Sequence, residues 1–252
     1  MRPSKALILM AKAPLPGTVK TRLCPPLTAA SAASLYAGML SDLAEEVGAG
    51  LRGVRRYLFF FPPGTEAEAH FDAKPFRRFE RVLQRGRNLG ERMDRAIRVA
   101  LSDGARRVVV IGADCPFLTA SRIRSAFREL SGPADLVFGP SEDGGFYLIG
   151  ASFPVTDLFR GVAWGTGSAL AEVASRCRRS GLSFAFLPTE FDVDRPADLD
   201  ALRRRFAGRL VPACPRTRRW LGGSTGVGPA PSGAGRGSAS SRGPGRRFHT
   251  GR

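Results

Sequence analysis

The loop that follows the first apolar run carries side chains whose types and spacing suit the binding of an anion. It holds Lys12 and Lys20, two of only four lysines in a chain with 35 arginines, and Arg22 lies beside them. A lysine ammonium contacts a phosphate as a point charge, and an arginine guanidinium forks around its oxygens. Pro16 and Gly17 shape the loop, and Gly17 would let the backbone approach a ligand closely. We therefore expect these five residues to bind the phosphates of a nucleotide.

This loop is not a P-loop of the Walker type. A Walker loop ending at Lys20 and Thr21 would need glycines at positions 14 and 19, where this chain has Pro14 and Val19. A solvated basic turn would also account for the residues of the loop, so two interpretations stay open at this point.

Three aspartates are candidates to hold a divalent cation. Asp114 follows a strongly apolar run, so we expect it at the carboxyl end of a central strand. Asp192 and Asp194 alternate along an extended segment, and we expect only one of them to point into a site. Carboxylates are preferred ligands of Mg²⁺ and Mn²⁺, which can bridge a protein to phosphates. Asp114 could instead cap the following turn, and the two later residues could belong to an acidic surface turn.

A second acidic segment, 139–147, combines two acids with a Gly-Gly pair. Asp143 could bind sugar hydroxyls or act as a general base, and Gly144 and Gly145 would let the backbone lie against a substrate. A hairpin turn of the Asp-Gly type explains the same residues without a function. The sequence leaves both explanations open.

Two further positions could add contacts to the same site. Arg92 lies near the start of a helix predicted over 89–102, where the helix N-terminus favours anions. Trp164 could form one wall of a pocket for an acceptor, or could pack in the core. His70 and His249 lie in contexts that suit catalysis poorly, and the four cysteines are scattered without a C-x-x-C pair. We therefore expect neither histidine-based catalysis nor a zinc or disulfide framework.

Apolar runs of strand length alternate with helical patterns from residue 6 to residue 206. The expected strands cover 6–10, 56–61, 79–84, 107–112, 135–138, 146–149 and 183–187, and the expected helices cover 28–47, 89–102, 121–130, 167–179 and 197–206. This alternation predicts an α/β fold with a mostly parallel central sheet and flanking helices. Because ligands bind such sheets at the carboxyl ends of the strands, the candidate residues should meet at one edge.

The composition bounds the organisation of the chain. With 252 residues, 43% of them hydrophobic, we expect one sizeable core, which we place in a catalytic domain over 1–210. Residues 211–252 are rich in Gly, Pro, Ser and Arg, with eight arginines and no acidic residue, and we expect a disordered tail. Such a tail could touch nucleic acid weakly through its charge, or could simply be solvated.

Membrane and export signals are both missing from the sequence pattern. No apolar run approaches the roughly 20 residues that span a bilayer. The first residues pass directly into a strand-like run without the cleavage site of a signal peptide. We therefore expect a cytoplasmic protein without a membrane span.

Six motifs occur in order along residues 5–207: AKAPLPGTVKTRL, NLGERM, IGADCP, GPSEDGGFYLIG, WGT and DVDRPADL. Together they resemble a bacterial family of GT-A-fold proteins described as arsenosugar-biosynthesis glycosyltransferases or as nucleotide-diphospho-sugar transferases. The resemblance implies a Rossmann-like nucleotide-binding sheet in which the first loop wraps the nucleotide. It also implies that Asp114 holds a metal, with Asp192 or Asp194 as the second ligand. The family is related to guanylyltransferases that act on the molybdenum cofactor and on phospholactate.

The residues and the resemblance together predict a function. The leading hypothesis is a transferase that uses Mg²⁺ or Mn²⁺ to move a sugar from a nucleotide sugar to a small acceptor. Lys20 and Arg22 would stabilise the diphosphate, and Asp143 would lie near the transferred sugar or the acceptor. One alternative is a nucleotidyltransferase that condenses a nucleoside triphosphate with a phosphorylated small molecule. The other is a non-catalytic protein that binds nucleic acid through its arginine-rich tail.

Overall fold

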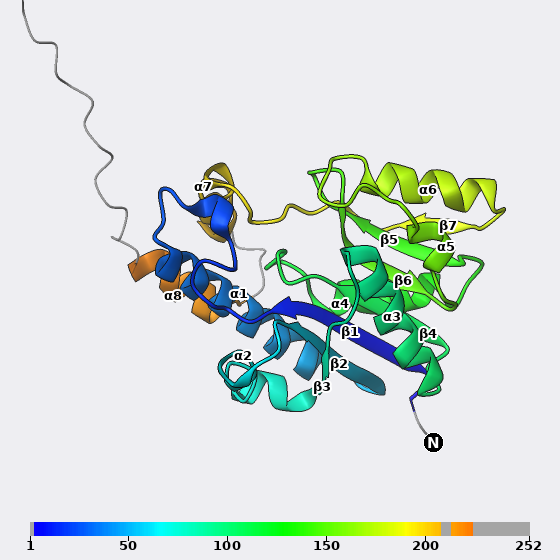
Figure 1. Cartoon of the computed structure of the whole chain (residues 1–252), viewed down its shortest axis with the longest axis horizontal. Coiled ribbons are helices and arrows are strands. Elements are labelled where there is room, and N and C mark those ends of the chain that lie inside the picture. The colour runs from blue at the N-terminus through cyan, green and yellow to red at the C-terminus, as the bar shows by residue number, and fades with distance from the viewer. Residues whose placement is uncertain (1–2, 208–212, 224–252) are drawn as a thin grey trace, which may run out of the picture.

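A seven-stranded sheet forms the centre of the molecule (Figure 1). The computed structural model describes residues 3–207 and 213–223. The strands follow the order β3-β2-β1-β4-β6-β5-β7, and their bounds are β1 Lys5–Lys12, β2 Val54–Phe61, β3 Glu80–Leu83, β4 Arg107–Ile111, β5 Leu136–Pro140, β6 Phe146–Ala151 and β7 Phe184–Phe186. Only β6 runs antiparallel to its neighbours within this sheet, so the predicted mostly parallel sheet is confirmed.

The two central strands are apolar along almost their whole length because helices cover both faces of the sheet. Residues 6–11 of β1 and 108–111 of β4 are all buried. A strand that is buried on both faces carries a continuous apolar run rather than an alternating one. Successive side chains of β1 still point to opposite faces of the sheet, since Leu9 contributes to one hydrophobic core and Ile8 to the other.

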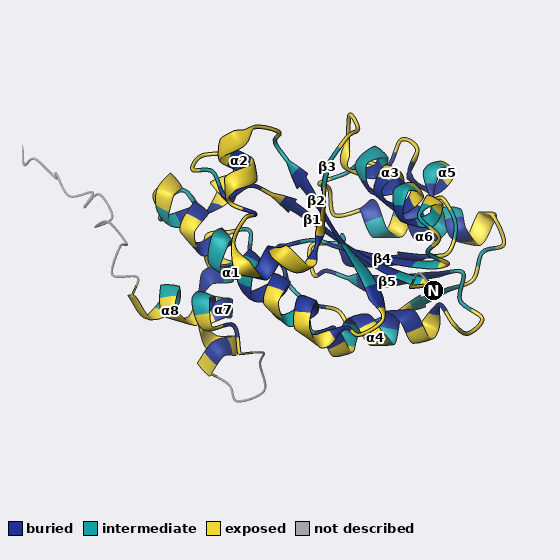
Figure 2. Cartoon of the chain, turned by 90° about the horizontal axis from the view of Figure 1, so that it is seen from below, coloured by how far each residue is buried: buried dark blue, intermediate teal, exposed yellow. Residues whose placement is uncertain are grey.

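The helices divide between the two cores. One core takes side chains from α1 Ala29–Gly50, α2 Thr65–Ala69, α4 Ala120–Glu129 and α7 Pro196–Ala207, and is flanked by α8 Pro215–Gly223; the other takes side chains from α3 Leu89–Ser102, α5 Thr156–Phe159 and α6 Ala169–Arg179. Figure 2 shows the sheet between these two layers, with the buried residues of the helices turned inward. None of the described helices is both long enough and apolar enough to cross a bilayer.

Local sequence signals begin three of these helices. Thr28, Asn88 and Thr119 stand directly before α1, α3 and α4, and each side chain accepts a hydrogen bond from the backbone N–H three residues later. These bonds satisfy donors that the first turn of a helix leaves unpaired. Every strand and helix expected from the apolar pattern is present within a few residues. β6 is antiparallel because a short loop joins it directly to β5, and such a turn reverses the chain.

The C-terminal region differs from the expected disordered tail. Helix α8 packs on α1. Asp42 on α1 is buried and accepts hydrogen bonds from Thr217 N and Thr217 Oγ1, each 2.8 Å long. The Arg216 guanidinium binds both Asp42 and Glu45. These contacts join the start of α8 to the middle of α1.

The disordered tail predicted over 211–252 was therefore wrong for residues 213–223, which include α8 and pack on α1. Composition did not reveal this because the contact depends on one carboxylate, Asp42, in a distant helix. The other residues of the predicted tail lie outside the described part of the chain.

Candidate functional site

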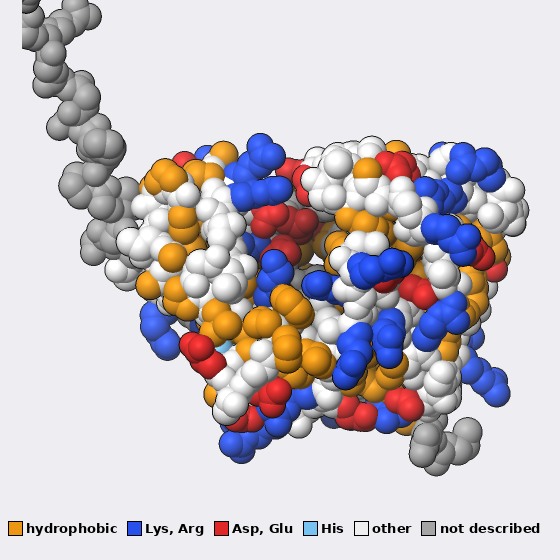
Figure 3. Space-filling view, in the orientation of Figure 1, with side chains coloured by type: hydrophobic (Ala, Val, Ile, Leu, Met, Phe, Trp, Pro, Cys, Tyr) orange, Lys and Arg blue, Asp and Glu red, His pale blue; other side chains and the backbone are white. Residues whose placement is uncertain are grey.

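A cavity of about 440 Å³ opens at the carboxyl ends of β1 and β4. Its walls come from the loops after these two strands, the β5–β6 hairpin, the start of α3, the loop before α6 and the segment before α7. Figure 3 shows acidic side chains gathered in a hollow of this face, beside lysine and arginine side chains. The cavity brings together most of the residues that the sequence predicted, namely Lys12, Lys20, Arg22, Arg92, Asp114, Asp143, Gly145, Asp192 and Asp194.

Two predicted residues of the first loop lie outside the walls of the cavity. Pro16 and Gly17 form an outer turn of the loop. Gly17 has a φ of 78°, and a Cβ at this position would meet nothing within 4 Å. The positive φ accounts for a glycine at this turn, and its predicted contact with a ligand stays a prediction.

Three basic side chains line the cavity without an acidic partner among the described residues. Lys12 and Arg22 are exposed, and Arg92 is half-buried with its guanidinium carbon 4.7 Å from the centre of the Phe61 ring. Such groups can contact phosphate oxygens without first breaking an ion pair. The predicted phosphate contacts of these three residues are compatible with their positions.

Lys20 lies deeper than the other cations. Its backbone is left-handed, with φ 50° and ψ 34°, directly before the 3-10 turn η1 Thr21–Leu23, and residues with a Cβ adopt this conformation rarely. Its side chain is only 3% exposed and donates hydrogen bonds to Asp114 and, at 2.8 Å, to Asp194 Oδ1. Burial by itself lowers the pKa of Lys20, but the charges of the two carboxylates outweigh burial and the pKa is raised. The side chain is therefore a charged ammonium held by two acids.

The backbone ties Asp114 to the segment that carries the other two candidate ligands. Val193 N donates a hydrogen bond to Asp114 O over 3.0 Å. Val193 is fully buried, while Asp192 and Asp194 on either side of it both line the cavity. The expectation that only one of these two would point into the site was wrong, because residues two apart in an extended segment face the same side.

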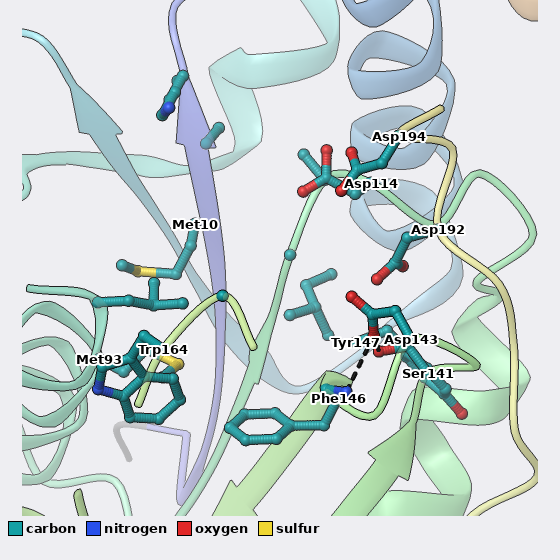
Figure 4. Close-up of a pocket in the computed structure, with 18 of the residues that line it drawn as sticks. Met10, Met93, Asp114, Ser141, Asp143, Phe146, Tyr147, Trp164, Asp192 and Asp194 are labelled. Atoms are coloured by element: carbon teal, nitrogen blue, oxygen red, sulfur yellow. Dashed lines mark hydrogen bonds between the residues drawn. The ribbon is translucent and has the colours of Figure 1, made fainter. Parts of the chain in front are cut away.

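Four carboxylates face one end of the cavity, those of Asp114, Asp143, Asp192 and Asp194 (Figure 4). Burial, followed by the charges of Asp114 and Asp143, raises the pKa of Asp192 to about 7. Hard oxygen ligands of this kind suit Mg²⁺ or Mn²⁺, and a divalent cation would offset their charge. In the described part of the chain, however, no three side chains of ligating type lie close enough to enclose an ion by themselves. The predicted metal ligands thus fit in their chemistry, and other ligands would have to complete the shell.

The β5–β6 hairpin brings Asp143 to the cavity. Asp143 Oδ1 accepts hydrogen bonds from Ser141 Oγ at 2.8 Å and from Gly145 N at 2.9 Å. Gly144 does not line the cavity; its φ is 83°, and a Cβ on it would lie 2.0 Å from Gly167 O. Gly144 therefore lets the hairpin touch the loop before α6, and its predicted contact with a substrate stays a prediction. The segment is both a hairpin turn and a part of the cavity wall.

The opposite end of the cavity is apolar. Trp164 lies so close to Gly90 that a Cβ on this glycine would be 2.8 Å from the indole ring. The indole also lines the cavity with Met10, Met93 and Phe146, as Figure 4 shows. The two interpretations of Trp164 are therefore compatible, because it packs on α3 and forms a wall of the cavity.

Sequence reasoning missed the methionines of this apolar end. Met10 and Met93 belong to elements whose apolar pattern already accounted for them as core residues. A signal was present, since the chain has only four methionines and Met10 stands near the carboxyl end of β1. The same argument from scarcity had singled out the lysines of the first loop.

Comparison with known proteins relates the sequence and the fold to a bacterial family. Residues 46–166 match a family model described as "Uncharacterized protein conserved in bacteria (DUF2064)". The crystal structure of a "putative nucleotide-diphospho-sugar transferase" from Desulfovibrio desulfuricans G20 is 31% identical in sequence, with a TM-score of 0.77, and the match covers 86% of this chain and 94% of that chain. No curated protein matches the sequence significantly.

More distant structures share the fold alone. A CMP:2-keto-3-deoxy-manno-octonic acid synthetase complexed with CTP is 14% identical, with a TM-score of 0.51 over 81% of this chain and 99% of that chain. A cytidylyltransferase from Leptospira borgpetersenii is 12% identical, with a TM-score of 0.51 over 81% of this chain and 87% of that chain. The matches support the superfamily and leave the narrower resemblance to arsenosugar-biosynthesis glycosyltransferases as a prediction. By its identity to the Desulfovibrio protein over most of both chains, this chain belongs to the same bacterial family, within the nucleotide-diphospho-sugar transferase superfamily.

Proposed function

We propose that this chain transfers a sugar from a nucleotide sugar to a small acceptor with the help of Mg²⁺ or Mn²⁺. The observation that carries the proposal is one cavity at the carboxyl edge of the sheet. Three cations that pair with no acid of the described residues line it, and four aspartates face one end of it. A nucleotide sugar presents a diphosphate to the cations and to a metal, and sugar hydroxyls to carboxylates. The description of the Desulfovibrio relative as a nucleotide-diphospho-sugar transferase supports the same class of donor.

The diphosphate would lie against the exposed cations. Lys12 and Arg22 flank the first loop, and Arg92 approaches from α3. Lys20 was predicted for this role together with Arg22, but its ammonium is bound by Asp114 and Asp194. We therefore assign the direct phosphate contacts to Lys12, Arg22 and Arg92, and give Lys20 a supporting position beneath the acids.

The acidic end would hold the divalent cation. Asp114, Asp192 and Asp194 supply carboxylate oxygens, and the phosphates of the donor would complete the set of ligands. A bound Mg²⁺ or Mn²⁺ supplies positive charge where the leaving diphosphate gains negative charge. The backbone hydrogen bond between Val193 and Asp114 keeps the two loops that carry these acids in a fixed relation.

Asp143 would act on the acceptor. Its Oδ1 is taken by two hydrogen bonds from the hairpin, which leaves Oδ2 to accept from a hydroxyl group. In the proposed step, the acceptor oxygen forms a bond to the anomeric carbon while the bond from that carbon to the diphosphate breaks. The diphosphate leaves with the electron pair, and Asp143 takes the proton of the attacking hydroxyl. Trp164 would form the wall against which the acceptor lies.

Nucleotidyl transfer is the second candidate. Three cations without acidic partners among the described residues converge on one cavity, which also suits a triphosphate. A phosphorylated small molecule would then attack the innermost phosphate, and pyrophosphate would leave. The same metal ligands and cations would serve this reaction because negative charge again develops on a leaving phosphate group.

Product analysis separates the two reactions. The full chain would be incubated with Mg²⁺ or Mn²⁺ and either a panel of nucleotide sugars or a panel of nucleoside triphosphates, each with pooled small-molecule acceptors. Release of a nucleoside diphosphate supports sugar transfer, and release of pyrophosphate replaces it with nucleotidyl transfer. Asp114→Asn should slow either release on the order of 10²-fold or more, whereas Glu66→Gln, a matched change of an exposed acid on α2, should leave it unchanged. Absence of both products from the wild-type protein with every donor would refute the proposal.

A further inference from the structure

Lys20 is buried beneath two carboxylates that remain open to the cavity. Its side chain is 3% exposed, while the side chains of Asp114 and Asp194 are 48% and 40% exposed. The ammonium binds Oδ1 of each acid, and Oδ2 of each acid takes no part in these bonds. The buried ammonium of Lys20 thus holds both acids through Oδ1, and Oδ2 of each acid stays accessible to a ligand.

This arrangement has an electrostatic consequence for metal binding. The energy between two charges falls only with the inverse of their separation, and a buried charge is screened less than one in water. An ammonium in contact with both acids therefore cancels part of the negative field that would attract a second cation. The described residues also do not bring three ligating side chains together around one point. Charge and geometry both leave the acidic end incomplete without a further anionic ligand.

We propose that Lys20 is a fixed counter-ion that keeps the Asp114–Asp194 pair at low affinity for divalent cations until a diphosphate binds beside it. The inference rests on the proposed function, because it concerns the same cation site. A nucleoside diphosphate group held by Lys12 and Arg22 would supply the missing negative charge and the missing oxygen ligands. Lys20 is then a positioning residue, and it makes cation binding depend on the presence of the nucleotide.

The opposing assignment makes Lys20 a direct phosphate ligand that leaves the acids when the nucleotide arrives. The burial of the side chain beneath the two acids argues against this movement, since the ammonium would have to give up both carboxylates. Lys12 provides the matched comparison, because it is a lysine of the same loop that lines the same cavity and pairs with no described acid.

The test is a titration with Mn²⁺ alone, followed by the electron paramagnetic resonance signal of free Mn²⁺, on purified full-length protein. Wild type should bind Mn²⁺ weakly. Lys20→Met should bind it more tightly, on the order of tenfold, because one unit of opposing charge is removed at contact distance. Lys12→Met, which removes a charge that is paired with neither acid, should change the Mn²⁺ affinity much less than Lys20→Met does. In thermal unfolding with GDP or UDP, the part of the Tm increase that depends on Mn²⁺ should be smaller in Lys20→Met than in wild type.

Several results would overturn the proposal. Lys20→Met leaves two acids without a hydrogen-bond donor and can fold poorly. Lys20→Gln, which keeps a donor but no charge, and Lys20→Arg, which keeps the charge, are therefore measured beside it. Mn²⁺ affinity in the neutral variants equal to or below that of wild type overturns the proposal, and so does tight binding of Mn²⁺ alone by wild type. A loss of nucleotide binding with unchanged Mn²⁺ affinity in Lys20→Met assigns the side chain to phosphate instead. These readouts need no turnover, so they fail separately from the product analysis that tests sugar transfer.

Discussion

The contact between α1 and α8 and the acidic end of the cavity each contain an ion pair between aspartate and a basic residue. The buried member of the pair is the acid in one of these regions and the base in the other. At the contact of α1 with α8, the side chain of Asp42 is 1% exposed and that of Arg216 is 37% exposed. At the cavity, the Lys20 side chain is 3% exposed, and Asp114 and Asp194 are 48% and 40% exposed. The anion is inside in the first cluster, and the cation is inside in the second.

The difference shows how one kind of ion pair can serve two purposes. Asp42 accepts hydrogen bonds from both Arg216 and Thr217, so its oxygens are used within the protein. A buried acid of this kind holds two helices together and has little to offer a ligand. Asp114 and Asp194, which are paired with the buried Lys20, keep oxygens that a ligand from solution can reach. Under the proposed function, the identity of the buried partner distinguishes the structural cluster from the proposed binding site.

The largest effect that would test this distinction is expected from Asp114→Asn. Removing a carboxylate that is proposed to hold the divalent cation should lower turnover on the order of 10²- to 10³-fold, because the cation would stabilise the charge that develops on the leaving group. Because the side chain of Asp114 is half exposed, the free energy of unfolding should change only slightly. The loss of turnover should therefore not be explained by unfolded protein. Initial rates and urea unfolding of the same preparation measure both quantities. Turnover close to that of wild type would remove Asp114 from the site.

Asp42→Ala should show the reverse pattern. It leaves Thr217 N and Thr217 Oγ1 without their buried acceptor, which should lower the free energy of unfolding by about 3 kcal/mol. Turnover per folded molecule should stay at the wild-type level. Glu45→Ala, which removes an exposed acid that binds the same arginine, should cost at most about 0.5 kcal/mol. Equal losses from the two substitutions in urea unfolding would contradict the structural role of Asp42.

The loops around the acidic end can be disturbed without changing any charge. In Gly144→Ala the φ of 83° and a Cβ 2.0 Å from Gly167 O should together cost about 2–3 kcal/mol of unfolding free energy and lower turnover through Asp143. Gly161→Ala is the matched control, because its φ is 67° but its Cβ would meet nothing within 4 Å. That control should cost only about 1 kcal/mol and spare turnover. Thermal unfolding and initial rates measure the two losses. If Gly144→Ala lost no more stability and turnover than Gly161→Ala, the contact between the hairpin and Gly167 would be unimportant.

The smallest expected loss of stability comes from the N-cap of α1, and it shows how much a local change in this helix costs. Thr28→Ala removes the N-cap hydrogen bond to Ser31 N and should cost about 1 kcal/mol. It changes the helix that carries Asp42 without changing a charge or the cavity, so turnover should be unaffected. Urea unfolding measures the loss. A cost as large as that of Asp42→Ala would mean that the integrity of α1, and not the buried carboxylate, accounts for the stability of the α1–α8 contact.

Much of the fold could be predicted from the sequence because buried parallel strands leave continuous apolar runs. The run at 107–112 predicted β4, and the rule that ligands meet the carboxyl ends of such strands placed Asp114 at the correct edge. The scarcity of lysine in the sequence singled out Lys12 and Lys20 as candidate site residues, and both of them line the cavity. These signals are local, so the sequence contains them directly.

The features that sequence reasoning missed depend on contacts between distant segments. Lys20 meets acids that lie 94 and 174 residues away, and its type alone does not distinguish a phosphate ligand from a buried counter-ion. Gly17 lies at a turn with a positive φ, and the close approach of Gly144 to Gly167 is a contact between loops that the sequence pattern does not reveal. The misjudged pair Asp192 and Asp194 is different, because the two-residue period of an extended chain would have placed both on one side.

The hydrogen bond from Val193 N to Asp114 O has a consequence for the motion of the site. Val193 is completely buried, so its amide hydrogen can exchange with solvent deuterium only when the two acid-bearing loops come apart. The exchange rate of this one amide therefore reports how often the acidic end opens. A ligand that bridges Asp114 and Asp194 should slow the exchange, even when no reaction takes place.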